Sequence, residues 1–139
     1  MLRNRIYTAL GLAALTAATI FLAPFWLFAL LFAAAASVGV HEWAGFAGLT
    51  STRQRLAYVA GWLLLVGVAL TQQAMWPQFV ELACLIWLFA FVSILLHPLF
   101  SRFYQNRWVA GSLGWVLMLC AWISLVTLFQ TENGKLWLL

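Results

Sequence analysis

The chain has 139 residues, 66% hydrophobic and only 7% charged, with a formal net charge of +4 and a mean hydropathy of +1.01. A soluble domain typically carries roughly a quarter charged residues, so this composition excludes a chain that covers its surface with polar side chains. Six of the seven basic residues fall in pairs between apolar runs and form no basic face, so we expect no nucleic-acid partner.

Taken in chain order, the apolar runs predict an all-α, polytopic membrane bundle of five complete transmembrane helices. A membrane-spanning helix needs about 20 predominantly apolar residues, and the alternation typical of a transmembrane barrel strand is missing from these runs. The predicted spans are residues 6–22, 25–45, 56–70, 79–96 and 108–129. A short apolar segment beginning at Leu136 predicts the start of a sixth helix.

The basic residues predict the orientation of these helices. Six of them precede the first span or lie in the loops after the second and fourth spans: Arg3, Arg5, Arg53, Arg55, Arg102 and Arg107. Only Lys135 falls on the other side. Since short cytoplasmic loops are enriched in Lys and Arg, we expect a cytoplasmic N-terminus and a multi-pass protein of the inner (cytoplasmic) membrane.

Small residues at a spacing of four predict how the first two spans pack. Because small side chains let helices approach closely in lipid, and the link at Pro24 is short, we expect spans one and two to pair along two such stripes as an antiparallel hairpin. The stripes are Ala9, Ala13 and Ala17 on span one, and Ala29, Ala33 and Ser37 on span two.

Aromatic residues recur every seven positions along the fifth span and therefore share one face of the helix. They are Trp108, Trp115, Trp122 and Phe129. A ridge that packs on other helices or faces lipid is our first interpretation. A stacking surface for a ligand base is the alternative.

Glu42 is the candidate substrate-binding residue, because ionisable side chains within membrane spans are costly and often functional. It lies about 25 Å along the second span at 1.5 Å per residue, near the inner edge of the hydrocarbon. Either it pairs with Arg53 or Arg55 while Trp43 joins the interfacial aromatic belt, or it belongs to a polar site at headgroup level. The sequence shows no nucleophile–base pair, no paired carboxylates and no metal-ligand cluster, so we assign no catalytic residue and no metal ligand.

Several short motifs in the first 55 residues occur together in a familiar order. The basic start Met1-Leu2-Arg3 is followed by an apolar hairpin broken at Pro24, and then by three motifs: Glu42-Trp43, Ala47-Gly48-Leu49-Thr50 and Arg53-Gln54-Arg55. This arrangement resembles the start of the bacterial phosphatidate cytidylyltransferases, also called CDP-diacylglycerol synthases. Beyond these residues the resemblance rests on hydropathy and on the charge of the loops.

The resemblance implies a membrane enzyme of phospholipid biosynthesis that condenses CTP with phosphatidic acid to give CDP-diacylglycerol and pyrophosphate, with Mg²⁺ as its metal. The family's signature, which is rich in Asp, Lys and Arg and ends in Asp-Arg-x-Asp, lies in the C-terminal half. This chain contains no aspartate, so no catalytic or Mg²⁺-binding residue can be matched to it. We therefore expect residues 1–139 to be the N-terminal transmembrane region, with the catalytic half absent and no activity as a fragment.

Two other functions fit the composition. The first is a stand-alone membrane interaction or assembly protein, and the second is a transporter subunit, which would favour polar or broken helices near mid-membrane. A homo-oligomer and the acyl-chain preference stay open.

Overall fold

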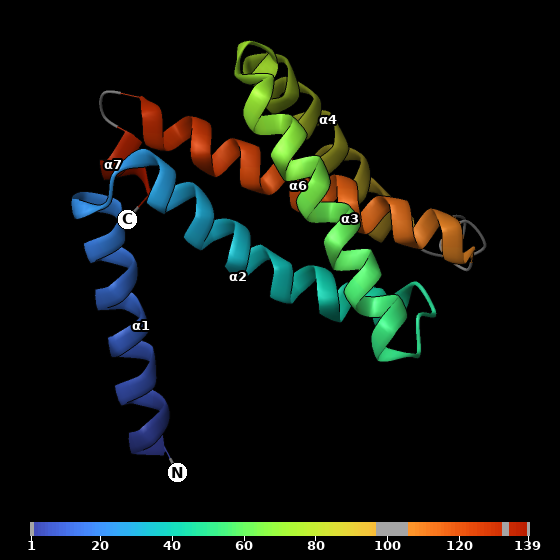
Figure 1. Ribbon diagram of the computed structural model, residues 1–139, viewed down its shortest axis with the longest axis horizontal. Helices are drawn as coiled ribbons and strands as arrows, with labels where there is room; N and C mark the ends of the chain where they lie inside the picture. The colour runs from blue at the N-terminus through green and yellow to red at the C-terminus, as the bar shows by residue number, and fades with distance from the viewer. Residues whose placement is uncertain (1, 97–105, 132–133, 139) are drawn as a thin grey trace.

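A computed structural model describes residues 2–96, 106–131 and 134–138, and within these ranges every regular element is a helix, which confirms the all-α prediction. Five long helices occupy the five apolar runs (Figure 1). They are α1 (Leu2–Leu22), α2 (Phe25–Phe46), α3 (Thr52–Thr71), α4 (Trp76–Leu95) and α6 (Arg107–Gln130). A 3₁₀ turn, η1 (Gln73–Met75), precedes α4, and the four-residue α7 (Gly134–Trp137) follows α6.

Local sequence explains where α2 ends and α3 begins. Gly48 has a φ of 74°, and the N–H of Leu49 donates to the carbonyl of Ala44 at 3.0 Å, the bond that closes a helix with a left-handed residue after its last turn. The Ser51 hydroxyl then accepts from the N–H of Gln54, whose side chain accepts from the N–H of Ser51. This capping box satisfies donors that a helix N-terminus leaves free.

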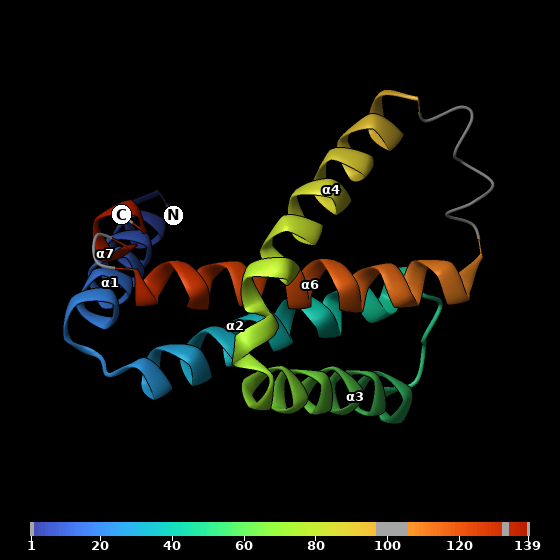
Figure 2. The ribbon, with the colours of Figure 1, turned by 90° about the horizontal axis from the view of Figure 1, so that it is seen from above.

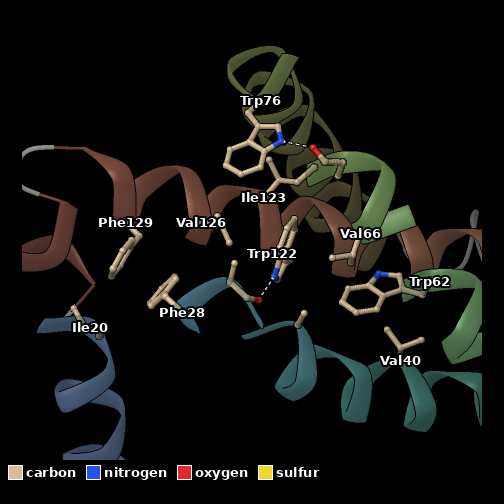
Figure 3. Packing of buried hydrophobic residues seen from close by; sticks show 13 residues of the cluster. Ile20, Phe28, Val40, Trp62, Val66, Trp76, Trp122, Ile123, Val126 and Phe129 are labelled. Atoms are coloured by element: carbon tan, nitrogen blue, oxygen red, sulfur yellow. Dashed lines mark hydrogen bonds between the residues drawn. The ribbon is translucent and has the colours of Figure 1, made fainter. Parts of the chain in front are cut away.

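Helices α2 and α6 run antiparallel and form the centre of the bundle (Figures 1 and 2). The indole N–H of Trp122, a side chain only 1% exposed, donates to the carbonyl of Ala29 at 3.0 Å (Figure 3). Further along the same interface, the rings of Phe28 and Phe129 stack with centroids 4.1 Å apart. The Trp122 indole gains from this bond because an unpaired N–H is costly in an apolar core.

Helices α3 and α4 pack on this pair through other tryptophans. The N–H of Trp76, at the start of α4, donates to the carbonyl of Ala69 at 2.9 Å, and its ring meets Trp122 edge-on at 6.2 Å (Figure 3). Trp62 of α3 is fully buried near Val40 and Val66, as Figure 3 shows. The centre of the core is therefore aromatic.

The predicted hairpin of the first two helices is wrong. The chain turns sharply near Pro24, so that α1 makes a steep angle with α2 and does not lie alongside it (Figures 1 and 2). Ala13, a member of the predicted stripe on the first span, is exposed. Ala29 and Ala33 are buried, as expected for a packing stripe, but they belong to the core shared with α6. The stripe of small residues on α2 correctly indicated a close contact with another helix. That helix is α6, whose Trp122 side chain packs in the same core as Ala29 and Ala33.

Four helical segments are long and apolar enough to cross a membrane: Phe25–Phe46, Thr52–Thr71, Gln73–Leu95 and Arg107–Gln130. The apolar segment of α1, Ala13–Leu22, is shorter and is not among these four candidate spans. Four candidate spans support a multi-pass membrane protein. The count of five, the sixth span and the cytoplasmic N-terminus stay predictions. Arg102, which was used to predict the orientation, lies outside the described residues, as do the side chains of Arg3 and Arg5.

Candidate functional site

The end of α2 and the starts of α3 and α6 lie toward the same end of the bundle (Figure 1), and three basic residues of the described structure belong to the first turns of α3 and α6. They are Arg53, Arg55 and Arg107, and we call this part of the bundle the basic end. Glu42 lies on the last turns of α2, so it also belongs to the basic end. The charge pattern of the sequence and the fold thus place the candidate residue beside the predicted cytoplasmic loops.

Glu42 itself is exposed, and within the described structure it forms no ion pair with Arg53 or Arg55. The guanidinium of Arg55 is directed elsewhere, since its Nε donates to the carbonyl of Leu49 at 2.9 Å. The expected pairing of Glu42 with a loop arginine is therefore not formed. An exposed carboxylate at a helix end is available to a ligand or to another part of the protein, and its role stays a prediction.

Trp43, which follows Glu42, fixes α2 to α6. It is half-buried, and its Nε1 donates to the carbonyl of Ala110 at 2.8 Å. A Cβ atom placed on Gly114 would lie only 2.2 Å from Cδ1 of Trp43, so the indole lies directly on the glycine backbone of α6. Trp43 is thus an interhelical contact, and its place in an interfacial aromatic belt stays a prediction.

Tyr58 and Trp115 form a second connection, between α3 and α6. The Tyr58 hydroxyl donates to the carbonyl of Gly111, and Nε1 of Trp115 donates to the carbonyl of Tyr58 at 3.2 Å. Their rings stack with centroids 5.1 Å apart, and a Cβ on Gly61 would come within 2.8 Å of the Trp115 ring. The two side chains exchange hydrogen bonds with each other's helix, which holds α3 at a fixed position on α6.

A pocket of about 440 Å³ lies beside these connections at the basic end. Its walls come from the loop after α2, the first turns of α3 and the first three turns of α6. The polar and aromatic groups that line it are Gln54, Tyr58, Arg107, Trp108, Ser112 and Trp115. Arg107 is the one charged group among the described lining residues, so the pocket is suited to an anion.

The aromatic face of α6 changes character along its length. Trp122 and Phe129 are 1% and 7% exposed and pack in the core, whereas Trp108 is 75% exposed. Trp115 is half-buried and stacks on Tyr58. The helix-packing interpretation therefore holds for three of the four side chains, while Trp108 projects at the edge of the pocket.

The groups described at the basic end are suited to binding a ligand. In the described ranges, no group of three or more His, Cys, Asp or Glu side chains is close enough to hold a metal ion. The described residues therefore provide no ligand set for the Mg²⁺ that the family resemblance implies. What the site offers is a positive, aromatic pocket held by two interhelical connections.

The sequence analysis identified Glu42-Trp43 as a motif but did not identify the α6 residues that Trp43 contacts. The signal was present in α6, where Ala110, Gly111 and Gly114 put three small residues within five positions. Small residues on a membrane helix mark a close approach, and here what approaches is an aromatic ring.

Comparison with known proteins adds a family to this geometry. Residues 3–139 match the cytidylyltransferase family. A phosphatidate cytidylyltransferase of Pseudomonas aeruginosa is 36% identical over 131 residues, which make up 94% of this chain and 48% of that protein. The chain thus spans about half the length of this relative. No solved structure matches significantly.

Proposed function

The chain belongs to the cytidylyltransferase family, and we propose that it is the N-terminal membrane region of a phosphatidate cytidylyltransferase. The reaction would join CTP to phosphatidic acid, giving CDP-diacylglycerol and pyrophosphate. The observation that carries the proposal is 36% identity over nearly the whole chain to an enzyme of that name.

In this proposal the described bundle anchors and positions catalytic residues that lie outside it. Mg²⁺ would neutralise charge on the phosphates of CTP, and its ligands would come from the part of the relative's length that this chain does not span. Residues 1–139 would then have no turnover of their own. The chain would cross the inner membrane five times with its N-terminus in the cytoplasm, so that the basic end faces the compartment that holds CTP.

The interhelical connections give this anchoring role a physical basis. Trp43 fixes α2 to α6, and Tyr58 with Trp115 fixes α3 to α6, all within the first three turns of α6. A catalytic half that contacts the basic end would meet three helix ends at set positions. Such support matters because a catalytic group displaced by about 1 Å can cost a hundredfold in rate.

A chimera tests the proposal. This chain would be fused to the part of the Pseudomonas aeruginosa relative that it does not span, and expressed in a strain depleted of its own phosphatidate cytidylyltransferase. We expect the chimera to restore growth, and the relative's C-terminal part alone to fail. A chimera that inserts in the membrane at normal abundance yet does not support growth would refute the proposal.

A further inference from the structure

Helix α1 packs on the rest of the bundle near one end. There the Ile20 side chain is 1% exposed and belongs to the hydrophobic core, near Phe28 and Phe129 (Figure 3). Toward its N-terminal end the helix projects away from the other helices (Figure 1), and the side chains of Ile6 and Leu10 are 49% and 61% exposed. Most of the described surface of α1 is therefore left uncovered.

One face of α1 continues the packing that begins at Ile20. Residues three, four or seven positions apart share a face of an α-helix, so Ala17, Ala13 and Ile6 lie on the same side as Ile20. Ile20 is buried, Ala17 is half-buried, and Ala13 and Ile6 are exposed. We call Ile6, Ala13 and Ala17 the α1 seam. Its two alanines allow another helix to approach closely in lipid, so the seam extends an existing interface that the described helices do not cover.

The C-terminal end of the described chain lies beside the buried end of the α1 seam. Helix α7 is next to the C-terminal end of α1 (Figures 1 and 2), where Nζ of Lys135 donates to the carbonyl of Phe21 at 3.5 Å and lies 5.0 Å from the ring centre of Phe129. The N–H of Leu138 donates to the carbonyl of Gly134 at 3.2 Å, the i to i−4 bond of an α-helix. The Leu138 side chain also packs against the core. A helical turn therefore delivers the chain to the seam.

We propose that the chain which continues from α7 forms a helix that packs along the α1 seam, antiparallel to α1. This inference rests on the proposed function, in which further chain follows residue 139. The 131 matched residues make up only 48% of the Pseudomonas aeruginosa relative, so the relative has ample length for this helix.

The dimensions of the seam fit one membrane-spanning helix. From Ile20 to Ile6 the face extends about 21 Å at 1.5 Å per residue. A helix of about 20 residues that returns across a hydrocarbon layer about 30 Å thick covers this whole length. Because the new helix would begin at the buried end of the seam, it would reach Ala17 first and Ile6 last. Continuity with the core and the nearby chain end favour this occupant over lipid or a second copy of the protein.

Cysteine crosslinking in the membrane tests the contact. The protein is the chimera described above, with all of its own cysteines replaced by alanine. One cysteine is then introduced by Ala13→Cys on the α1 seam, and a second is placed in turn at each of about 20 positions after residue 139, the length of one span. Ala18→Cys is the matched control, because Ala18 is also an exposed alanine of α1 but lies about 140° around the helix from Ala13. Disulfides are located by mass spectrometry without reduction.

We expect Ala13→Cys to form disulfides within one chain, at positions that recur every three or four residues. Ala18→Cys should form none, because cysteines whose Cα atoms are more than about 7 Å apart cannot be bridged without backbone movement. Equal yields from the two cysteines, or no disulfide within the chain of an inserted chimera, would overturn the proposal. Disulfides that join two copies through position 13 would overturn it as well, since a second copy would then cover the seam.

Growth of the depleted strain separates this inference from the proposed function. A chimera that forms the expected disulfides but does not restore growth would support the helix contact and contradict the enzyme assignment. A chimera that restores growth without these disulfides would do the reverse.

Discussion

Gly114 is a position in the core of α6 at which a single added methyl group would collide with the side chain of another helix. In Gly114→Ala the new Cβ would lie 2.2 Å from Cδ1 and 2.5 Å from Nε1 of Trp43, far inside van der Waals contact. The indole is the more mobile partner, so we expect it to swing off α6. That movement breaks its 2.8 Å hydrogen bond to the Ala110 carbonyl.

Two opposing effects set the magnitude. Overpacking a well-packed contact typically costs about 1–3 kcal/mol, and an interhelical hydrogen bond in a membrane contributes about 0.6 kcal/mol. Alanine is the better helix former, by up to about 1 kcal/mol, which offsets part of the loss. We therefore expect Gly114→Ala to lower the free energy of unfolding by about 2 kcal/mol.

The assay is unfolding by SDS in mixed micelles, followed by far-UV circular dichroism. Gly67→Ala is the matched control, because a Cβ there meets nothing within 4 Å, and its free energy of unfolding should be unchanged or slightly raised. In a Trp43→Ala background the clash is absent, so Gly114→Ala should cost little. The resulting coupling between positions 43 and 114 should be about 1–2 kcal/mol, within the range for residues in contact. Additive effects in this double-mutant cycle would refute the contact.

Three further predictions follow from other contacts. Tyr58→Phe removes the hydroxyl that donates to the α6 backbone and should lower the free energy of unfolding by about 0.5–1.5 kcal/mol in the same SDS titration; an unchanged value would show that this bond contributes nothing. Trp122→Phe loses buried volume and a hydrogen bond to α2 and should cost about 2 kcal/mol, whereas Trp108→Phe, at an exposed position, should stay within about 0.5 kcal/mol; equal effects would contradict the core described above. Glu42→Gln in the chimera should lower CDP-diacylglycerol formation without changing membrane insertion, because Glu42 is exposed and forms no ion pair in the described structure; an unchanged rate would make it a residue of the interface only.

The sequence predicted the helices well because hydropathy and proline positions act locally. The predicted spans 25–45 and 108–129 agree with α2 and α6 to within one residue at each end. Pro24 ends the first run as expected, since proline has no N–H to continue the helix.

The choice of helix partner was not predictable from the same signals. Ala29 and Ala33 marked a close contact, but small residues do not specify which helix approaches. That depended on Trp122, whose indole reaches the Ala29 carbonyl from 93 positions away in the chain. Likewise, the contact of Trp43 with Gly114 of α6 could not be predicted from the residues that surround Trp43 in the sequence. Which large residue packs against which small residue far away in the chain cannot be predicted from the local sequence around either of them.

The central claim is that this interlocked bundle is the membrane region on which a cytidylyltransferase depends. Its most direct test is the rate of CTP-dependent CDP-diacylglycerol formation by the purified chimera, compared between Gly114→Leu and Gly67→Leu. We predict that Gly67→Leu keeps the parent rate and that Gly114→Leu, which displaces Trp43 from α6, loses most of it. Equal rates for the two variants, or no CDP-diacylglycerol from the folded parent chimera, would contradict the account.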